Sequence, residues 1–173
     1  MEQRGRQIAQ QEFSSRELRS ALGAFATGVT VITTHGAEHP YGMTANAFAS
    51  VSLDPPLVLV CVASGTQGSE SIERNGVFAV NVLSAEQESI SRFFASRDRP
   101  RGWDAFSEIP HQRGVSGSPI LAGVAAHLDC LLAASHVAGD HIIFIGEVLA
   151  LAVDPEVGPL LFHHGRYRFL SEE

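Results

Sequence analysis

One stretch decides the fold: Gly42-Met-Thr-Ala-Asn-Ala-Phe-Ala-Ser-Val-Ser-Leu-Asp-Pro-Pro-Leu-Val-Leu-Val-Cys-Val-Ala-Ser64. It opens with small and hydroxyl-bearing residues, over which the backbone can approach a flat ligand closely. The apolar alternation that carries Ser50 and Ser52 predicts a strand, which Asp54-Pro55-Pro56 stops. The uninterrupted apolar run Leu57–Val62 predicts a buried strand. We therefore expect a strand, a hard turn and a buried strand, with hydroxyls at both ends, as the wall of a cofactor site.

The composition is that of one ordinary globular domain. The 173 residues are 45% hydrophobic and 18% charged, which is sufficient for a full core. The formal net charge of −7 argues against nucleic acid and against anionic membrane surfaces as partners, because both require a basic face. All 12 basic residues are arginine. The absence of lysine excludes Schiff-base and lysine-nucleophile chemistry.

The ends of the chain and its cysteines bear on its location. Residues 1–13 are predicted to be a flexible leader, and residues 14–173 a single domain. The leader lacks the apolar core of a secretory signal, and no apolar run has the length of a membrane span. Cys61 and Cys130 lie in apolar strand-like runs, which favours buried free thiols and leaves a disulfide open. We expect a cytoplasmic protein.

The first half of the chain contains signals for two short helices. Ser14 and Glu17 have the spacing of a capping box ahead of a short amphipathic helix over residues 15–26. Ser69 is expected to be the N-cap of a second helix, which runs to Arg74.

The second half predicts mostly strands. Ser84 and Gln87 form another capping box, ahead of a helix whose buried stripe includes Phe94. Residues 97–118 are predicted to be either a functional flap or a segment that is partly ordered by a partner chain. Strands are expected at 29–34, 78–83, 120–124, 127–135, 142–151 and 160–170. Because β-α-β alternation is absent, we expect a mainly β protein: an antiparallel barrel with peripheral helices.

Several common chemistries lack their motifs. No Gly-x-Gly-x-x-Gly follows a strand, so a Rossmann fold is not expected, and a P-loop would require lysine. Gly114-Val-Ser-Gly117 falls short of a nucleophile elbow. Pairs of potential metal ligands lack a third and a fourth partner at zinc-like spacing; these pairs are His163–His164, His127–Cys130 and His136–His141. We predict no metal site.

Five motifs occur in a sensible order along nearly the whole chain. They are Gly28-Val-Thr-Val-Ile-Thr33, Gly42-Met-Thr-Ala-Asn-Ala-Phe48, Ser50-Val-Ser-Leu-Asp-Pro-Pro-Leu57, Phe78-Ala-Val-Asn-Val-Leu83 and Gly139-Asp-His141. Together they resemble the short flavin reductases that serve as the reductase component of two-component, flavin-diffusible monooxygenases. The resemblance implies a Greek-key-like FMN-binding split β-barrel, usually homodimeric, that uses NAD(P)H to reduce FMN or FAD. It also implies a separate monooxygenase as partner.

The resemblance assigns cofactor contacts residue by residue. The isoalloxazine ring is expected against Thr44, Ala45, Asn46 and Ala47, and its pyrimidine edge and ribityl chain against Ser50, Val51 and Ser52. The other side is lined by Cys61, Val62, Ala63 and Ser64. Hydroxyls are expected near the phosphate, at Ser64, Thr66 and Ser69, helped by a helix N-terminus. Phe94 is included among the contacts. Arg74 or Arg92 could add charge there, or be solvated helix residues.

The turn Gly139-Asp140-His141 is implied to lie beside the nicotinamide. His141 is the candidate catalytic residue, which would orient the nicotinamide or stabilise charge, whereas a plain hairpin turn would explain only Gly139 and Asp140. Tyr167 is predicted to contact the cofactor, with core packing as the alternative. NADH is the expected reductant, and NADPH stays open. Two alternatives also stay open: an oxidase of the pyridoxamine-phosphate type, and a flavin carrier that does not react with NADH.

Overall fold

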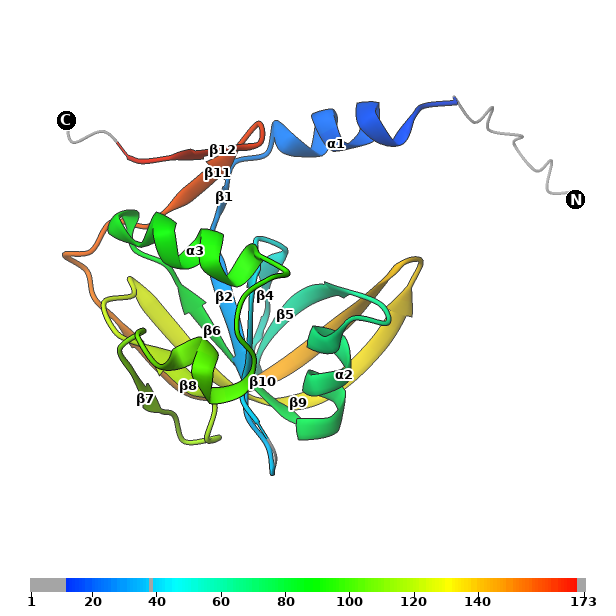
Figure 1. Ribbon diagram of the computed structural model, residues 1–173. Helices are drawn as coiled ribbons and strands as arrows, with labels where there is room; N and C mark the ends of the chain where they lie inside the picture. The colour runs from blue at the N-terminus through cyan, green and yellow to red at the C-terminus, as the bar shows by residue number, and fades with distance from the viewer. Residues whose placement is uncertain (1–11, 38, 171–173) are drawn as a thin grey trace, which may run out of the picture.

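In the computed structural model, residues 12–37 and 39–170 are described, and they form a curved β-sheet flanked by helices (Figure 1). Most of the expected leader, residues 1–11, lies outside the described residues. Strands dominate and the helices are few and short, which confirms the predicted mainly β class. No helix in the described ranges is long and apolar enough to cross a membrane.

The main sheet has seven antiparallel strands in the order β3-β2-β6-β9-β10-β5-β4. Their bounds are β2 Thr30–Thr34, β3 Tyr41–Ala45, β4 Phe48–Leu53, β5 Pro56–Ala63, β6 Val77–Val82, β9 Ala126–Ala138 and β10 His141–Val153. Alternate residues of β5 are buried, which shows that one face of this strand packs on the core. A main apolar cluster, which includes Ile32, Phe78 and Phe144, fills the inside of the curved sheet.

The two edge strands of this sheet are consecutive in the sequence. Only Asn46 and Ala47 separate β3 from β4, although the two strands lie at opposite edges. The sheet must therefore curl until its edges meet. Within the described residues no hydrogen-bonded ladder joins β3 to β4, so the barrel stays split, as expected for the split β-barrel. The stretch from Gly42 to Ser64 thus holds three strands rather than the expected two.

The N-terminal helix, α1 Ser15–Gly23, begins as expected and ends early. Ser14 is the N-cap and forms the predicted capping box with Glu17. The helix ends at Gly23 rather than at residue 26, and it projects from the barrel (Figure 1). Three large apolar residues in and after it are exposed: Leu18, Leu22 and Phe25.

Two more helices contact β3 from its opposite faces: Met43 lies against α2, whereas Gly42 and Thr44 lie against α3. The first, α2 Gln67–Asn75, follows the N-cap Thr66, so the expectation that Ser69 is the N-cap is wrong. The second, α3 Glu88–Ala95, follows the short 3-10 helix η1 Ala85–Gln87. A second apolar cluster lies under α3 and includes Leu83, Phe94 and Phe106.

The expected flap packs on this second cluster. It contains the 3-10 helix η2 Gly102–Phe106 and the hairpin of β7 His111–Arg113 with β8 Pro119–Leu121. The end of the flap is fixed by the buried carboxylate of Asp129, which accepts a hydrogen bond from the Ser116 N–H (2.8 Å). The flap is therefore ordered by the core of its own chain.

The C-terminal segment forms a small sheet next to α1. The strands β1 Thr27–Gly28, β11 Leu161–His163 and β12 Arg166–Arg168 lie in the order β1-β11-β12 (Figure 1). The strand expected over 160–170 is therefore a hairpin. Its turn lies at His164-Gly165, where both residues have positive φ.

We expect Gly146→Ala to lower the free energy of unfolding by about 1–3 kcal/mol. An added methyl group would lie 2.5 Å from the Phe78 ring and 2.8 Å from Cβ of Cys130, in the middle of the main cluster. Urea denaturation measures the change. Gly158→Ala is the control, because no atom lies within 4 Å of its added Cβ. Equal stabilities of the two variants would contradict this packing.

Candidate functional site

The β3–β4 link lies directly against the end of β5. The Cys61 N–H donates to the Ala47 carbonyl at 3.0 Å, and the Thr30 hydroxyl donates to the Ala45 carbonyl at 2.6 Å. Asn46 and Ala47 are exposed, and Asn46 donates through its side-chain amide to the Thr27 hydroxyl at 3.3 Å. The structure therefore brings together the two groups predicted from the sequence, residues 44–47 and 61–64.

The turn Gly139-Asp140-His141 joins the same place from the other side of β5. It closes the long β9–β10 hairpin, and Gly139 supplies a positive φ of 64°. The Ser64 N–H donates to the Asp140 carbonyl at 2.9 Å, and His141 lies opposite Ala63 in the β10–β5 ladder. Link, strand end and turn thus form one contiguous surface, which we call the platform: residues 44–47, 61–64 and 139–141.

The imidazole of His141 is held by the neighbouring carboxylate. Its Nδ1 lies 2.7 Å from Oδ1 of Asp140. The hydrogen bond from His141, and next the charge of its imidazole, hold the pKa of Asp140 below its ordinary value. A carboxyl whose pKa is lowered in the folded state stabilises the fold at neutral pH, and this stabilisation is lost as the pH falls through the lowered pKa. In the structure, the hydrogen bond between the two side chains sets the orientation of the imidazole.

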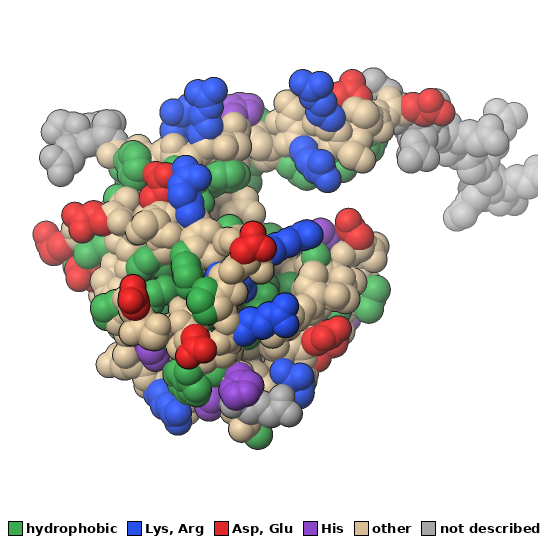
Figure 2. Space-filling model, in the orientation of Figure 1, with side chains coloured by type: hydrophobic (Ala, Val, Ile, Leu, Met, Phe, Trp, Pro, Cys, Tyr) green, Lys and Arg blue, Asp and Glu red, His purple; other side chains and the backbone are tan. Residues whose placement is uncertain are grey.

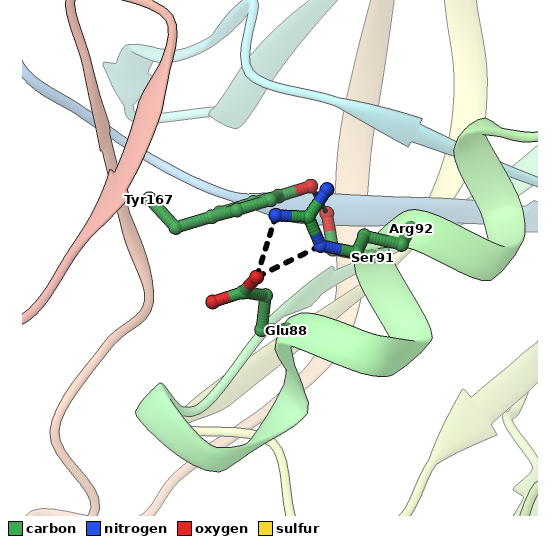
Figure 3. Close-up of polar contacts among 4 residues, drawn as sticks. All are labelled: Glu88, Ser91, Arg92 and Tyr167. Atoms are coloured by element: carbon green, nitrogen blue, oxygen red, sulfur yellow. Dashed lines mark hydrogen bonds and ion pairs between the residues drawn. The ribbon is translucent and has the colours of Figure 1, made fainter.

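Tyr167 reaches the platform through α3 rather than directly. Its hydroxyl lies 2.8 Å from Oγ of Ser91, whose backbone carbonyl accepts a hydrogen bond from the Thr44 hydroxyl at 2.6 Å. The Arg92 guanidinium lies over the Tyr167 ring, 4.8 Å from its centroid, and pairs with Glu88 at 2.7 Å (Figure 3). The C-terminal hairpin is thereby tied to the end of β3.

Two predicted contacts are buried in roles that do not leave them free for a ligand. The Ser69 hydroxyl donates to the Thr66 carbonyl at 2.9 Å inside the α2 capping box, and Ser69 is only 1% exposed. Phe94 is also 1% exposed, and its ring packs directly under Gly42. Direct cofactor contact by these two side chains does not fit their burial. Both instead hold neighbouring walls in place from behind.

The serine pair on β4 is affected by a bulge. The ladder with β5 shifts register between Ser50 and Ser52, which leaves Val51 as the extra residue. The Ser52 hydroxyl accepts a hydrogen bond from the Asp54 N–H at 3.2 Å and so supports the turn into β5. On β5 itself the Val62 side chain is buried in the main cluster, so only its backbone can face a ligand.

The sequence predictions missed a basic cavity next to the platform. Its volume is about 450 Å³, and its lining includes Arg97, Arg99 and Arg101 from the flap together with Thr66 and Gln67 at the start of α2. Figure 2 shows basic side chains grouped near the middle of this face. The spacing Arg-x-Arg-x-Arg in a chain without lysine was the available signal.

The chemistry of the platform suits a flat ligand with hydrogen-bonding edges. β4 is an edge strand, so part of its backbone N–H and C=O groups have no ladder partner. Small side chains at residues 45 and 47 leave the link open.

In the described part of the chain, histidines, cysteines and carboxylates form no group that could hold a metal ion. Cys61 and Cys130 are free thiols, and burial raises the pKa of Cys130 to about 12.

Comparison with known proteins identifies the family. The flavin reductase like domain matches residues 22–171, so the chain belongs to that family. An NADH-dependent FAD reductase of Streptomyces globisporus is 46% identical over 153 residues, which cover 88% of this chain and 84% of that protein. The reductase subunit HsaB of a flavin-dependent monooxygenase from Rhodococcus jostii is 43% identical over 160 residues, which cover 92% and 80%.

A solved structure has the same fold. BorF, the flavin reductase component of a bacterial two-component tryptophan halogenase, superimposes with a TM-score of 0.87 at 41% identity, covering 92% of this chain and 100% of that one. The expected family and its split-barrel fold are therefore confirmed.

We expect Ser69→Ala to lower the free energy of unfolding by about 1 kcal/mol, because the hydroxyl completes the α2 capping box. Flavin affinity should change less than twofold, since this hydroxyl is already bonded to Thr66. Urea denaturation and a flavin titration give the two values. Ser135→Ala, at an exposed position of β9, serves as control. Weaker flavin binding at unchanged stability would contradict this account and show that the Ser69 hydroxyl contacts the flavin phosphate.

Proposed function

We propose that this chain oxidises NADH to reduce FMN or FAD, and that the reduced flavin serves a separate flavin-dependent monooxygenase in the cytoplasm. The observation that carries the proposal is the contiguity of the platform. The segment expected to hold the flavin and the turn expected to hold the nicotinamide are joined through β5, by hydrogen bonds at Cys61 and Ser64. Hydride transfer requires the two rings to be held in contact, so positioning is the main task of the protein.

The flavin side of the site is built from backbone and small side chains. Flavin, when bound, supplies the hydride acceptor. Residues 44–47 offer the ring a flat surface of backbone and mostly small side chains. The Thr44 hydroxyl is held in place by its hydrogen bond to the Ser91 carbonyl. The open edge of β4 near Ser50 offers backbone groups to a pyrimidine edge. The positions of these groups support the proposed contacts.

The phosphate of the flavin is proposed to enter the basic cavity. Among the described residues, the backbone N–H groups of Gln67 and Gly68 at the start of α2 have no intramolecular partner. Such amides, together with the positive end of the helix dipole, favour an anion. Arg97 and Arg99 line the same cavity. We propose that these amides and arginines bind the phosphate in place of the Ser69 hydroxyl predicted from the sequence.

The nicotinamide is proposed to bind at the turn. The His141 imidazole is about half exposed, and its orientation is fixed by Asp140. It can therefore contact NADH that approaches the exposed side of the platform. In this arrangement the reductant is selected by the turn at residues 139–141 and not by residues 44–47.

A second copy of the chain is proposed to complete the site as a homodimer. Phe25 is 77% exposed, and with Asn46 and Phe48 it lines a cavity of about 320 Å³ at the β3–β4 link. Leu18 and Leu22 of α1 are also exposed within the described chain. An apolar helix side that projects from the body next to the site favours burial against a partner subunit.

Catalytic turnover tests the proposed reaction. We expect NADH oxidation that requires added FMN or FAD. In His141→Ala, the KM for NADH should rise about tenfold, while the Kd for flavin changes less than twofold, because the turn contacts the nicotinamide alone. His136→Ala, which removes an imidazole from the neighbouring strand, should leave both values near those of the wild type. No flavin-dependent NADH oxidation would contradict the reductase and favour the flavin carrier.

Light scattering after size-exclusion chromatography tests the dimer. The wild type should have twice the chain mass of 18.5 kDa, and the double variant Leu22→Glu/Phe25→Glu should shift to a single chain, because the charges oppose burial. Arg16→Glu in the same helix is the charge-changing control. A monomeric wild type would overturn this part of the proposal.

A further inference from the structure

The basic cavity continues into a second one. The first cavity, of about 450 Å³, and the second, of about 520 Å³, share part of their lining. The shared residues are Pro40, Tyr41, Gln67, Arg101 and Gly102. The two cavities thus form one groove that runs from the platform side along α2, which we call the arginine groove. Arg97 lines only the first cavity, whereas Arg74 lines only the second.

The arginine groove concentrates positive charge in an acidic protein. Four of the 12 basic residues line it, although the net charge of the chain is −7. They are Arg74, Arg97, Arg99 and Arg101. The ion pairs found among the described residues are Arg92–Glu88 and His141–Asp140, so none of the four is paired with a carboxylate there. Uncompensated arginines in a concave site favour an anionic ligand.

Arg99 is held in place by two hydrogen bonds and forms a rigid part of the lining of the groove. Arg99 donates to the backbone carbonyls of Ser96 and Gly42, which are neutral acceptors and leave its charge available. Its guanidinium lies 5.1 Å from the centroid of the Tyr41 ring, which lines both cavities. Glu70 is the carboxylate that lines the second cavity. A single carboxylate against Arg74 and Arg101 leaves this half positive.

The position of the groove relative to the platform sets what can fill it. Its lining starts at Gly42 and Thr66. Gly42 is two residues from the platform along β3, which is about 7 Å in an extended strand, and Thr66 follows Ser64 through the turn at Gly65. A flavin held at residues 44–47 would therefore place its first phosphate in the first cavity. FMN ends there, so it leaves the second cavity unfilled.

We propose that the second cavity binds the adenosine-diphosphate half of FAD, so that the chain selects FAD over FMN. The inference rests on the proposed flavin site and adds a specificity to it. Arg74 and Arg101 supply charge for the second phosphate, and Tyr41 supplies a flat aromatic surface for adenine. The volume of about 520 Å³ lies in the range of sites for small molecules.

Flavin titrations without NADH test this specificity. We expect the wild type to bind FAD at least about tenfold more tightly than FMN, since a charge-assisted hydrogen bond has roughly that effect or more. Arg74→Gln should remove most of this preference. Arg97→Gln should weaken FMN and FAD alike, because both place a phosphate in the first cavity. Arg113→Gln, which loses the same charge outside both cavities, should leave both affinities unchanged.

Three results would overturn the inference. Equal affinity of the wild type for FMN and FAD would do so, as would an equal loss of both flavins in Arg74→Gln. A raised KM for NADH in Arg74→Gln at unchanged FAD affinity would assign the second cavity to the adenosine half of NADH instead. These binding results are distinct from a failure of the proposed function, which would appear as absent NADH oxidation with either flavin.

Discussion

The two-residue link between β3 and β4 is the constraint on which the rest of the structure depends. Asn46 and Ala47 let the ends of the two strands lie at most about 10 Å apart, yet they join strands at opposite edges of a seven-stranded sheet. The sheet has to curl, and curling creates the enclosed face that the main apolar cluster fills. On the other face of β3, Gly42 lies against the Phe94 ring of the second cluster, where a side chain would not fit.

The same constraint positions the site. Closure brings the link to the end of β5, where the Cys61 N–H bonds the Ala47 carbonyl. The long β9–β10 hairpin extends beside β5 and delivers its turn to Ser64. The groups of the site are therefore mostly backbone, in a short link and a tight turn that are held by the ends of paired strands. Such a surface is rigid and has little chemistry of its own, which suits a reaction whose reactive atoms belong to the bound cofactors.

The sequence predicted the strands, the family and the grouping of residues 44–47 with 61–64, because local periodicity and motif order carry that information. The sequence did not predict the break at Asn46 and Ala47, because these two residues include no glycine or proline that would mark a bend between strands. Ser69 was misassigned because Thr66 has the same cap chemistry three residues earlier. The arginine groove combines α2 with the flap, so only the tertiary structure shows that Arg74 and Arg97 line one groove.

The central claim is that the ring of the flavin binds at residues 44–47 and 61–64 of the platform and that its phosphates bind in the arginine groove. Amide NMR titrations with lumiflavin, which has the ring without the ribityl phosphate, test it directly. The account predicts shifts at residues 44–47 and 61–64, with Gln67 and Arg99 unaffected, whereas FMN shifts all of them. Lumiflavin shifts confined to the groove, or absent from residues 44–47, would contradict the account.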